Sequence, residues 1–180
     1  MKFTETELSG SFVIEVEKME DDRGFFGRLW CEDEFKKHNL NTNIVQSNVS
    51  LSNKKGTLRG MHFQKSPYQE TKLLRCTKGA VYDVIIDLRP ESPTFKKWFG
   101  VKLTEDNHKM IYVPENFAHG FLTLEDNSEV TYFVTQFYNK EAERVLRWND
   151  PAFNIKWPIE ITEISGKDRS HANFNLIDIT

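Results

Sequence analysis

Residues 43–64, NIVQSNVSLSNKKGTLRGMHFQ, carry the pattern that decides the fold. Apolar and polar residues alternate through 43–52 and again through 57–64, which is the period of a half-buried β-strand. The same alternation recurs in 11–19, 71–77, 80–89, 97–104, 109–114, 120–126, 129–138 and 143–148. About ten short strands with hardly any helix predict an antiparallel sandwich or barrel, and a jelly roll fits best.

The rest of the chain indicates turns, one helix and an irregular tail. A short helix is expected at 32–40, where acidic residues precede basic ones as the helix dipole favours. After residue 148 the chain is expected to wrap irregularly on the barrel. The 180 residues contain no internal repeat and no linker, so we expect a single jelly-roll domain spanning residues 1–180.

Composition and charge exclude several function classes. Hydrophobic residues make up 38% of the chain and the mean hydropathy is −0.57, as in soluble globular proteins. No segment has the length of a signal peptide core or a membrane span, so we expect a cytoplasmic protein without membrane contact. The net charge of −3 and the scattered lysines predict no nucleic-acid partner. Cys31 and Cys76 lack metal-type or redox-type spacing and are expected to be reduced thiols, one packed in a strand.

Alternation also sorts side chains by face. In 43–52 one face carries Gln46, Asn48, Ser50 and Ser52, and the other carries Val45, Val49 and Leu51. In 129–138, Tyr132 and Tyr138 fall together, opposite Phe133 and Phe137. If the apolar faces form the core, the polar faces either meet solvent or line a wet barrel mouth.

Arg59 and His62 lie three residues apart in one predicted strand, so strict alternation would place them on opposite faces. Gly60 stands between them, and glycine in a strand often marks a bulge beside an active site. We therefore predict a β-bulge or kink at Gly60 that turns Arg59 and His62 toward one cavity.

His62 and His119, on neighbouring predicted strands, could be either metal ligands or structural residues. His62 and His119 could bind a metal together with Glu70, although the first cluster, His62-Phe63-Gln64, lacks the second histidine that metal cupins usually supply. They could equally be structural histidines. Lys72, in a strand with an apolar pattern, is either an edge residue or a charge placed where an oxyanion forms. Taken singly, Arg23 and Asp168 would be ordinary turn and loop residues.

Seven segments together carry a family resemblance. They are DDRGFFGR (21–28), QSNVSLSNKKGTLRGMHFQ (46–64), TKLLRCTKGAVYDVIIDLRPESPTF (71–95), IYVPENFAHGF (111–121), EVTYFVTQFY (129–138), RWNDPAFNIKWP (147–158) and ISGKDR (164–169). In this order and over nearly the full chain, the sequence resembles the dTDP-4-dehydrorhamnose 3,5-epimerase family.

The resemblance implies a cupin-type jelly roll that acts without a metal or organic cofactor, as a homodimer whose N-terminal strands exchange between subunits. It implies a nucleotide-sugar substrate, a 4-keto-6-deoxy sugar whose carbons on either side of the ketone are inverted. A base and a group that stabilises the enolate oxygen suit that chemistry.

Residue roles follow from the same resemblance. His62 would be the base, Asp168 would orient it, Lys72 would meet the enolate oxygen with help from Arg59, and Tyr132 would donate a proton from the opposite face of the ring. Arg59 and Arg23 resemble diphosphate contacts. Four further residues match pocket positions of the family: Gln46, Asn48, His119 and Tyr138.

One segment departs from the family pattern and leaves the nucleotide open. After DDRGFF the family commonly has an acidic residue, where the neighbouring subunit's strand approaches the base, whereas this chain has Gly27-Arg28. Phe26 and Arg28 are therefore expected base contacts, with thymidine favoured and a cytidine-linked or other nucleotide sugar as the alternative. An enzyme that inverts only C3 or only C5, a metal-dependent cupin enzyme and a non-catalytic sugar-nucleotide-binding cupin are the competing functions.

Overall fold

The structure is a computed structural model that describes residues 1–179, so Thr180, the last residue of the expected domain, lies outside the described residues. Two antiparallel sheets face each other. The first has the order β1 (Lys2–Glu5), β2 (Phe12–Glu15), β10 (Met110–Val113), β7 (Lys72–Lys78), β12 (Ser128–Val134), β5 (Gln46–Ser52). The second has the order β13 (Glu143–Val145), β6 (Thr57–Gln64), β11 (Phe117–Thr123), β8 (Ala80–Asp87), β9 (Trp98–Thr104).

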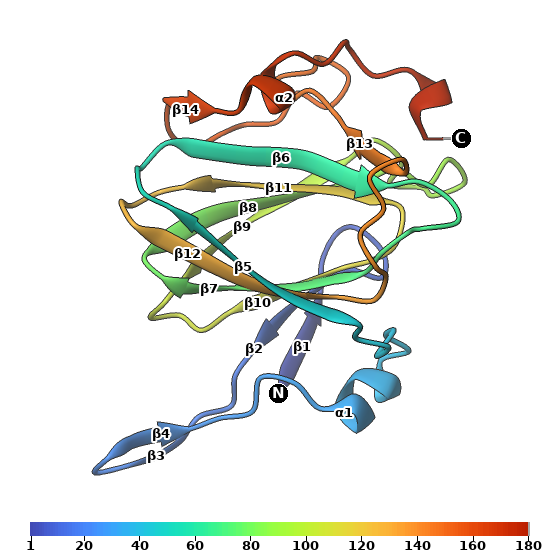
Figure 1. Cartoon of the computed structure of the whole chain (residues 1–180). Coiled ribbons are helices and arrows are strands. Elements are labelled where there is room, and N and C mark those ends of the chain that lie inside the picture. The colour runs from blue at the N-terminus through green and yellow to red at the C-terminus, as the bar shows by residue number, and fades with distance from the viewer. Residues whose placement is uncertain (180) are drawn as a thin grey trace.

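The smaller elements lie outside these sheets (Figure 1). Strand β14 (Glu163–Ile164) pairs in parallel with β6, and helix α2 (Gly166–Arg169) follows it across the same strand. Strands β3 (Met19–Asp21) and β4 (Gly24–Phe26) form a hairpin that extends away from the barrel. Helix α1 (Glu32–Lys37) and the 3₁₀ helix η1 (Leu176–Asp178) complete the described elements.

The antiparallel jelly roll predicted from alternation is confirmed, because each of the ten expected segments contains a strand. Several boundaries were wrong. The helix expected at 32–40 ends at Lys37, since Asn39 takes a positive φ of 58°. The strand expected to reach Tyr138 ends at Val134. Strands β1, β3, β4 and β14 and helix α2 were not predicted; they are short, and alternation needs about four to eight residues to be recognised.

Three apolar clusters hold the layers together. The cluster between the sheets includes Leu74, Ile85, Ile111 and Phe121, all buried. A second cluster joins the outer face of the β6–β9 sheet to the C-terminal segment, and a third joins the other sheet to helix α1 through Phe35. Burial of a large apolar side chain of this kind stabilises the fold by roughly 1.5–3 kcal/mol.

Strand β5 differs from the simplest reading of its pattern. Its apolar residues do not enter the core, because the side chains of Val49 and Leu51 are 65% and 50% exposed. Its polar face, which includes Gln46, Asn48 and Ser52, turns inward instead. β5 is also the last strand of its sheet, so its outer edge has no strand partner among residues 1–179. Of the two possibilities for the polar face, lining the barrel mouth is therefore the correct one.

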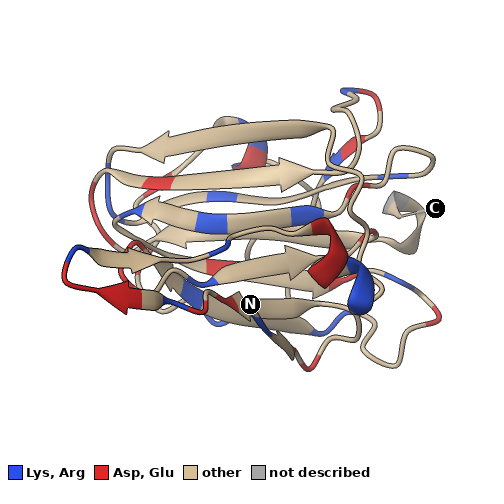
Figure 2. Cartoon of the chain, turned by 90° about the horizontal axis from the view of Figure 1, so that it is seen from below, with Lys and Arg blue, Asp and Glu red and all other residues tan. Residues whose placement is uncertain are grey.

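Charged residues of both signs are interspersed over the strands and helix α1 in the view of Figure 2. No helix among the described residues is long and apolar enough to span a membrane. Cys31 and Cys76 are both free thiols, and Cys76 is buried in β7, as expected. Burial raises the pKa of the Cys76 thiol to about 11, which keeps it protonated and unreactive.

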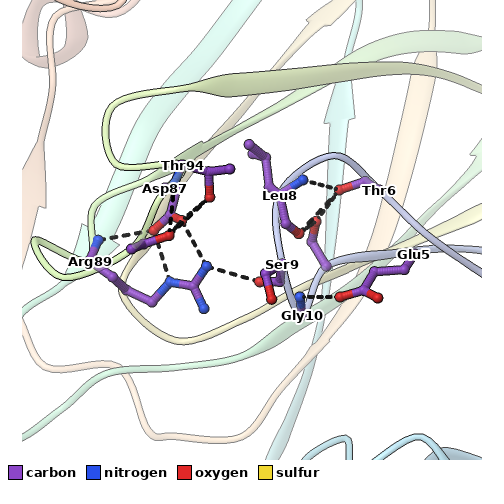
Figure 3. A network of polar contacts seen from close by, with 10 residues as sticks. Glu5, Thr6, Leu8, Ser9, Gly10, Asp87, Arg89 and Thr94 are labelled. Atoms are coloured by element: carbon purple, nitrogen blue, oxygen red, sulfur yellow. Dashed lines mark hydrogen bonds and ion pairs between the residues drawn. The ribbon is translucent and has the colours of Figure 1, made fainter.

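A polar network around Asp87 connects the end of β8 to the turn after β1 (Figure 3). The Asp87 carboxylate accepts hydrogen bonds from the Arg89 backbone and guanidinium at 2.7–3.0 Å, from Ser92 at 2.5 Å and from Thr94 at 2.6 Å. Arg89 Nη2 in turn donates to the Ser9 carbonyl at 2.9 Å. Burial opposes ionisation of Asp87, but these hydrogen bonds outweigh it and hold its pKa at about 2.

We expect Asp87→Asn to destabilise the fold by about 2 to 3 kcal/mol, because it removes the charge that these donors satisfy. Thermal unfolding should show a midpoint lower by about 4–12 °C, with Asp106→Asn at an exposed turn as the unchanged control. The folded pKa lies below the ordinary value, so ionised Asp87 stabilises the wild type by about 2 kcal/mol above roughly pH 4, and this is lost as the pH falls toward 2. An equal acid sensitivity in Asp87→Asn and wild type would contradict this assignment.

Candidate active site

A bulge in β6 brings Arg59 and His62 to one side of the strand. Arg59 lies opposite Phe121 of β11 and His62 lies opposite His119. The three-residue interval from Arg59 to His62 on β6 therefore pairs with a two-residue interval on β11, which is a β-bulge. Gly60, between them, has a φ of 135°, and a Cβ there would lie 2.5 Å from the Gly120 Cα. Only glycine fits this position. The predicted bulge is confirmed, and Arg59 and His62 line the same cavity.

That cavity has a volume of about 710 Å³ and opens between the two sheets. A second cavity of about 220 Å³ adjoins it, and His62, Lys72 and Tyr132 line both. The first cavity also receives Arg59 and His119 and is bordered by the segment 162–169. The second adds Gln46, Asn48, Gln64, Glu70, Tyr138 and Glu143. A space of this size is that of a small-molecule site.

His62 and Asp168 form a hydrogen-bonded pair at one wall of the cavity. The distance from His62 Nε2 to Asp168 Oδ1 is 2.7 Å, and Asp168 is buried. Ser165 caps helix α2 by accepting from the Asp168 amide, and the pairing of β14 with β6 fixes this segment. Burial opposes ionisation of Asp168, but the hydrogen bond and charge of His62, together with the hydrogen bonds from Ser165 and the Gly60 amide, outweigh it, so the pKa of Asp168 lies below its usual value. The carboxylate can therefore orient the imidazole at neutral pH.

A second histidine–carboxylate pair faces the first cavity from neighbouring strands. His119 Nε2 lies 2.9 Å from Asp83 Oδ2, and both side chains are buried. Sequence reasoning identified His119 but missed Asp83. Asp83 could have been noticed because it lies in the middle of the apolar strand 80–89, where an unpaired charge would be costly.

Lys72 and Tyr132 lie in the wall shared by the two cavities. Lys72 is 8% exposed and its Nζ lies 3.0 Å from Glu70 Oε1. Burial raises the pKa of Tyr132, the negative charge of Glu70 raises it further, and Arg59 opposes both. Tyr132 is therefore a neutral O–H donor over the physiological range, and Lys72 adds a cationic donor beside it.

Arg59 is a cation of the cavity wall that has no carboxylate partner among the described residues. Its guanidinium donates to Ser52 Oγ and to the Leu51 carbonyl, both at 3.0 Å, and it forms no ion pair with any residue in 1–179. A permanently charged group that already has fixed geometry at a cavity mouth suits a diphosphate or carboxylate.

The predicted pocket residues Gln46, Asn48 and Tyr138 line the second cavity. Gln46 Oε1 accepts from the Tyr138 amide at 3.0 Å, so Tyr138 reaches the cavity although it lies beyond the end of β12. The Tyr138 hydroxyl donates to Glu143 at 2.9 Å, and Lys167 pairs with the same carboxylate at 2.5 Å. Glu143 was missed because nothing in 143–148 distinguishes it from a solvent-facing strand residue.

The metal alternative built on His62, Glu70 and His119 is not supported by the geometry. Each of these side chains is engaged separately, with Asp168, Lys72 and Asp83 respectively. Across residues 1–179, no three His, Cys, Asp or Glu side chains are grouped as metal ligands would be.

Three predicted binding residues lie outside the cavities of their own chain. Arg23 is at the tip of the β3–β4 hairpin and pairs with Asp21 at 2.5 Å, and Phe26 in the same hairpin is 65% exposed. Arg28 pairs with Glu34 at 3.1 Å. None of the three borders either cavity, so the folded chain alone does not bring them to the His62 site.

Comparisons with known proteins identify the family of this chain. Residues 5–175 match the family model described as dTDP-4-dehydrorhamnose 3,5-epimerase. The dTDP-4-dehydrorhamnose 3,5-epimerase of Shigella flexneri is 40% identical over 97% of this chain and 96% of its own. The Bacillus anthracis epimerase, solved with TDP and pyrophosphate bound, is 41% identical with a TM-score of 0.92, covering 96% of this chain and 99% of that one.

A Legionella pneumophila dTDP-6-deoxy-D-glucose-3,5-epimerase, solved in complex with dTDP-4-keto-L-rhamnose, is 35% identical. Its TM-score is 0.86, with 93% of this chain and 89% of that chain covered. The sequence match spans nearly the whole chain and the folds superpose throughout, so this protein belongs to the dTDP-4-dehydrorhamnose 3,5-epimerase family.

Proposed function

We propose that this protein is an isomerase that epimerises dTDP-4-dehydro-6-deoxy-D-glucose at C3 and C5 to give dTDP-4-dehydro-L-rhamnose. One observation carries the proposal: a carboxylate-oriented histidine, a lysine and a neutral tyrosine border one space between the sheets. These are the parts that proton removal beside a ketone and return of a proton from the other face require.

In the proposed mechanism His62 is the base. Asp168 accepts a hydrogen bond from Nε2–H, which leaves Nδ1 of the neutral imidazole free to take the proton beside the ketone. The electron pair moves to the ketone oxygen, and the Lys72 ammonium, assisted by Arg59, stabilises the enolate. The Tyr132 hydroxyl returns a proton from the opposite face, and solvent then reprotonates Tyr132 and deprotonates His62. The same sequence at the second carbon completes the double inversion.

Arg59 is proposed to bind the diphosphate, and Gln46, Asn48, His119 and Tyr138 to border the sugar and nucleotide. The absence of a carboxylate partner for Arg59 within residues 1–179 supports this role, because a bound dianion would supply it. These groups bind and orient the substrate while Asp168, which contacts His62, positions the base.

Arg23, Phe26 and Arg28 are proposed to act on the partner subunit's site in a homodimer with exchanged N-terminal strands. The β3–β4 hairpin extends away from its own barrel (Figure 1) and exposes Met19 and Phe26. Strand β5 offers a matching surface, because its outer edge is unpaired and Val49 and Leu51 are exposed.

The dimer has a direct test. Light scattering should give about twice the chain mass of 21.1 kDa. The double change Val49→Lys and Leu51→Lys should return the mass to that of one chain, because it places two charges on the apolar edge. Glu105→Lys, at an exposed turn, is the matched control. A wild type of single-chain mass at micromolar concentration would contradict the exchange.

The substrate assignment is tested by NMR of the reaction product. We expect dTDP-4-dehydro-6-deoxy-D-glucose to be converted to a product inverted at both C3 and C5. Inversion at one carbon would establish the single-site alternative, and binding of TDP without turnover would establish the non-catalytic one. Stronger binding of CDP than of TDP would assign Arg28 to a cytosine nucleotide. The cytoplasmic location expected from the sequence stays a prediction.

A further inference from the structure

Glu70 forms a largely buried ion pair with Lys72 and has no part in the proposed mechanism. The two residues are two apart along the entry to β7, so both side chains point to the cavity side. Their side chains are 13% and 11% exposed, and the carboxylate lies 3.0 Å from the ammonium. Both border the second cavity together with His62 and Tyr132.

Glu70 is held on its other side by Gln64. Gln64 Nε2 lies 3.5 Å from Glu70 Oε2, and Gln64 itself is buried and fixed by the Tyr68 and Phe137 carbonyls at 2.9 and 3.2 Å. The Asn139 amide donates to Gln64 Oε1 at 2.6 Å. The position of the carboxylate is therefore set by a glutamine with little freedom to move.

The other carboxylates around the site are already engaged. Asp168 binds His62, Asp83 binds His119 and Glu143 binds Lys167. Within residues 1–179, Glu70 is thus the one acidic partner of Lys72. An ammonium with so little exposure is costly to leave unpaired. Arg59, which borders the same cavity as Lys72 and His62, adds a further positive charge there. Without Glu70, Lys72 would be drawn out of the cavity wall.

We propose that Glu70 is a positioning residue: its carboxylate holds the Lys72 ammonium in the wall between the two cavities, where Tyr132 also lies. The proposal rests on the proposed function, in which Lys72 meets the enolate oxygen and Tyr132 returns the proton. An ammonium has three donors, so one can bind Glu70 while the others remain for the substrate.

The charged and titratable groups that border the cavities with Tyr132 come from several elements. Arg59 and His62 lie on β6, His119 on β11, Lys72 at the start of β7 with Glu70 two residues before it, and Glu143 on β13, while β5 contributes only uncharged residues. The segment 162–169 adds Glu163, Lys167, Asp168 and Arg169. Burial is the main cause of the raised pKa of Tyr132, with Glu70 adding to it and Arg59 opposing it. Loss of the Glu70 charge should therefore lower the pKa of Tyr132.

The test compares wild type with Glu70→Gln, which preserves shape and removes the charge. In fluorotyrosine-labelled protein followed by fluorine NMR, with Tyr132→Phe assigning the resonance, we expect the Tyr132 titration midpoint to fall. We expect kcat to fall about 10-fold or more because Lys72 is misplaced, with the Kd for TDP unchanged within about twofold. The surface variant Glu32→Gln, which removes another glutamate–lysine pair, should change neither.

Glu70→Asp separates charge from contact, and it also keeps the proposal testable if Glu70→Gln unfolds. It should leave the Tyr132 midpoint near that of wild type but lower kcat, since the shorter side chain withdraws from Lys72. If Glu70→Gln kept the wild-type titration midpoint of Tyr132 and a kcat within about twofold of wild type, the proposal would be overturned. If the wild type itself fails to convert the dTDP sugar, the proposed function fails, while the midpoint still decides whether Glu70 sets the charge at Tyr132.

Discussion

His62→Asn is expected to lose about 10³-fold in kcat and to lose proton exchange at both carbons, because it removes the imidazole that Asp168 orients as the proposed base. Asparagine is too short to reach Asp168 Oδ1, but the pairing of β14 with β6 and the Ser165 cap still hold the α2 segment beside the site. The asparagine amide cannot accept the proton beside the ketone. The defect should therefore lie in the chemical step and not in binding.

The measurement is deuterium incorporation from deuterated water, followed by NMR, together with the Kd for TDP. We expect no label in the substrate or product and a Kd within about twofold of wild type. His171→Asn changes a histidine that borders neither cavity and should keep full turnover. Full turnover by His62→Asn would disprove the assignment of the base.

Tyr132→Phe is expected to separate the two halves of the reaction. His62 can still remove the proton and return deuterium from the same face, so label should enter the substrate at a measurable rate. Inversion needs the donor on the opposite face and should fall by about 10²- to 10³-fold. The raised pKa of Tyr132, caused first by burial, means that wild type keeps this donor across the neutral range.

The ratio of inversion to label incorporation measures this effect directly. It should fall in Tyr132→Phe and stay constant in Tyr68→Phe, which removes a hydroxyl that borders neither cavity. If both rates fell by the same factor, Tyr132 would be supporting the site as a whole instead of delivering the proton.

Much of the site could be predicted because alternation along a strand fixes which side chains share a face. The grouping of Gln46 with Asn48 needed only parity, and Gly60 between Arg59 and His62 was sufficient to predict the bulge. The pairing of His62 with Asp168 joins positions 106 residues apart. It was expected from the family resemblance and could not have been read from spacing.

The features that were missed depend on contacts that no local pattern records. Asp83 and Glu143 find their partners only when distant strands pair. Val49 and Leu51 have the pattern of a core face, but they lie on the last strand of a sheet and remain exposed. Arg23 and Phe26 were not missed: the family resemblance named them, although their hairpin is too short to show a period, and their place in the partner subunit's site stays a prediction.

The central claim is that one site removes and returns protons on both sides of the ketone. Wild-type protein incubated with dTDP-4-dehydro-6-deoxy-D-glucose in deuterated water tests it most directly. We predict a product with inverted configuration and one deuterium at each of C3 and C5. Active protein that releases an inverted product without deuterium at either carbon would contradict an enolate formed by His62.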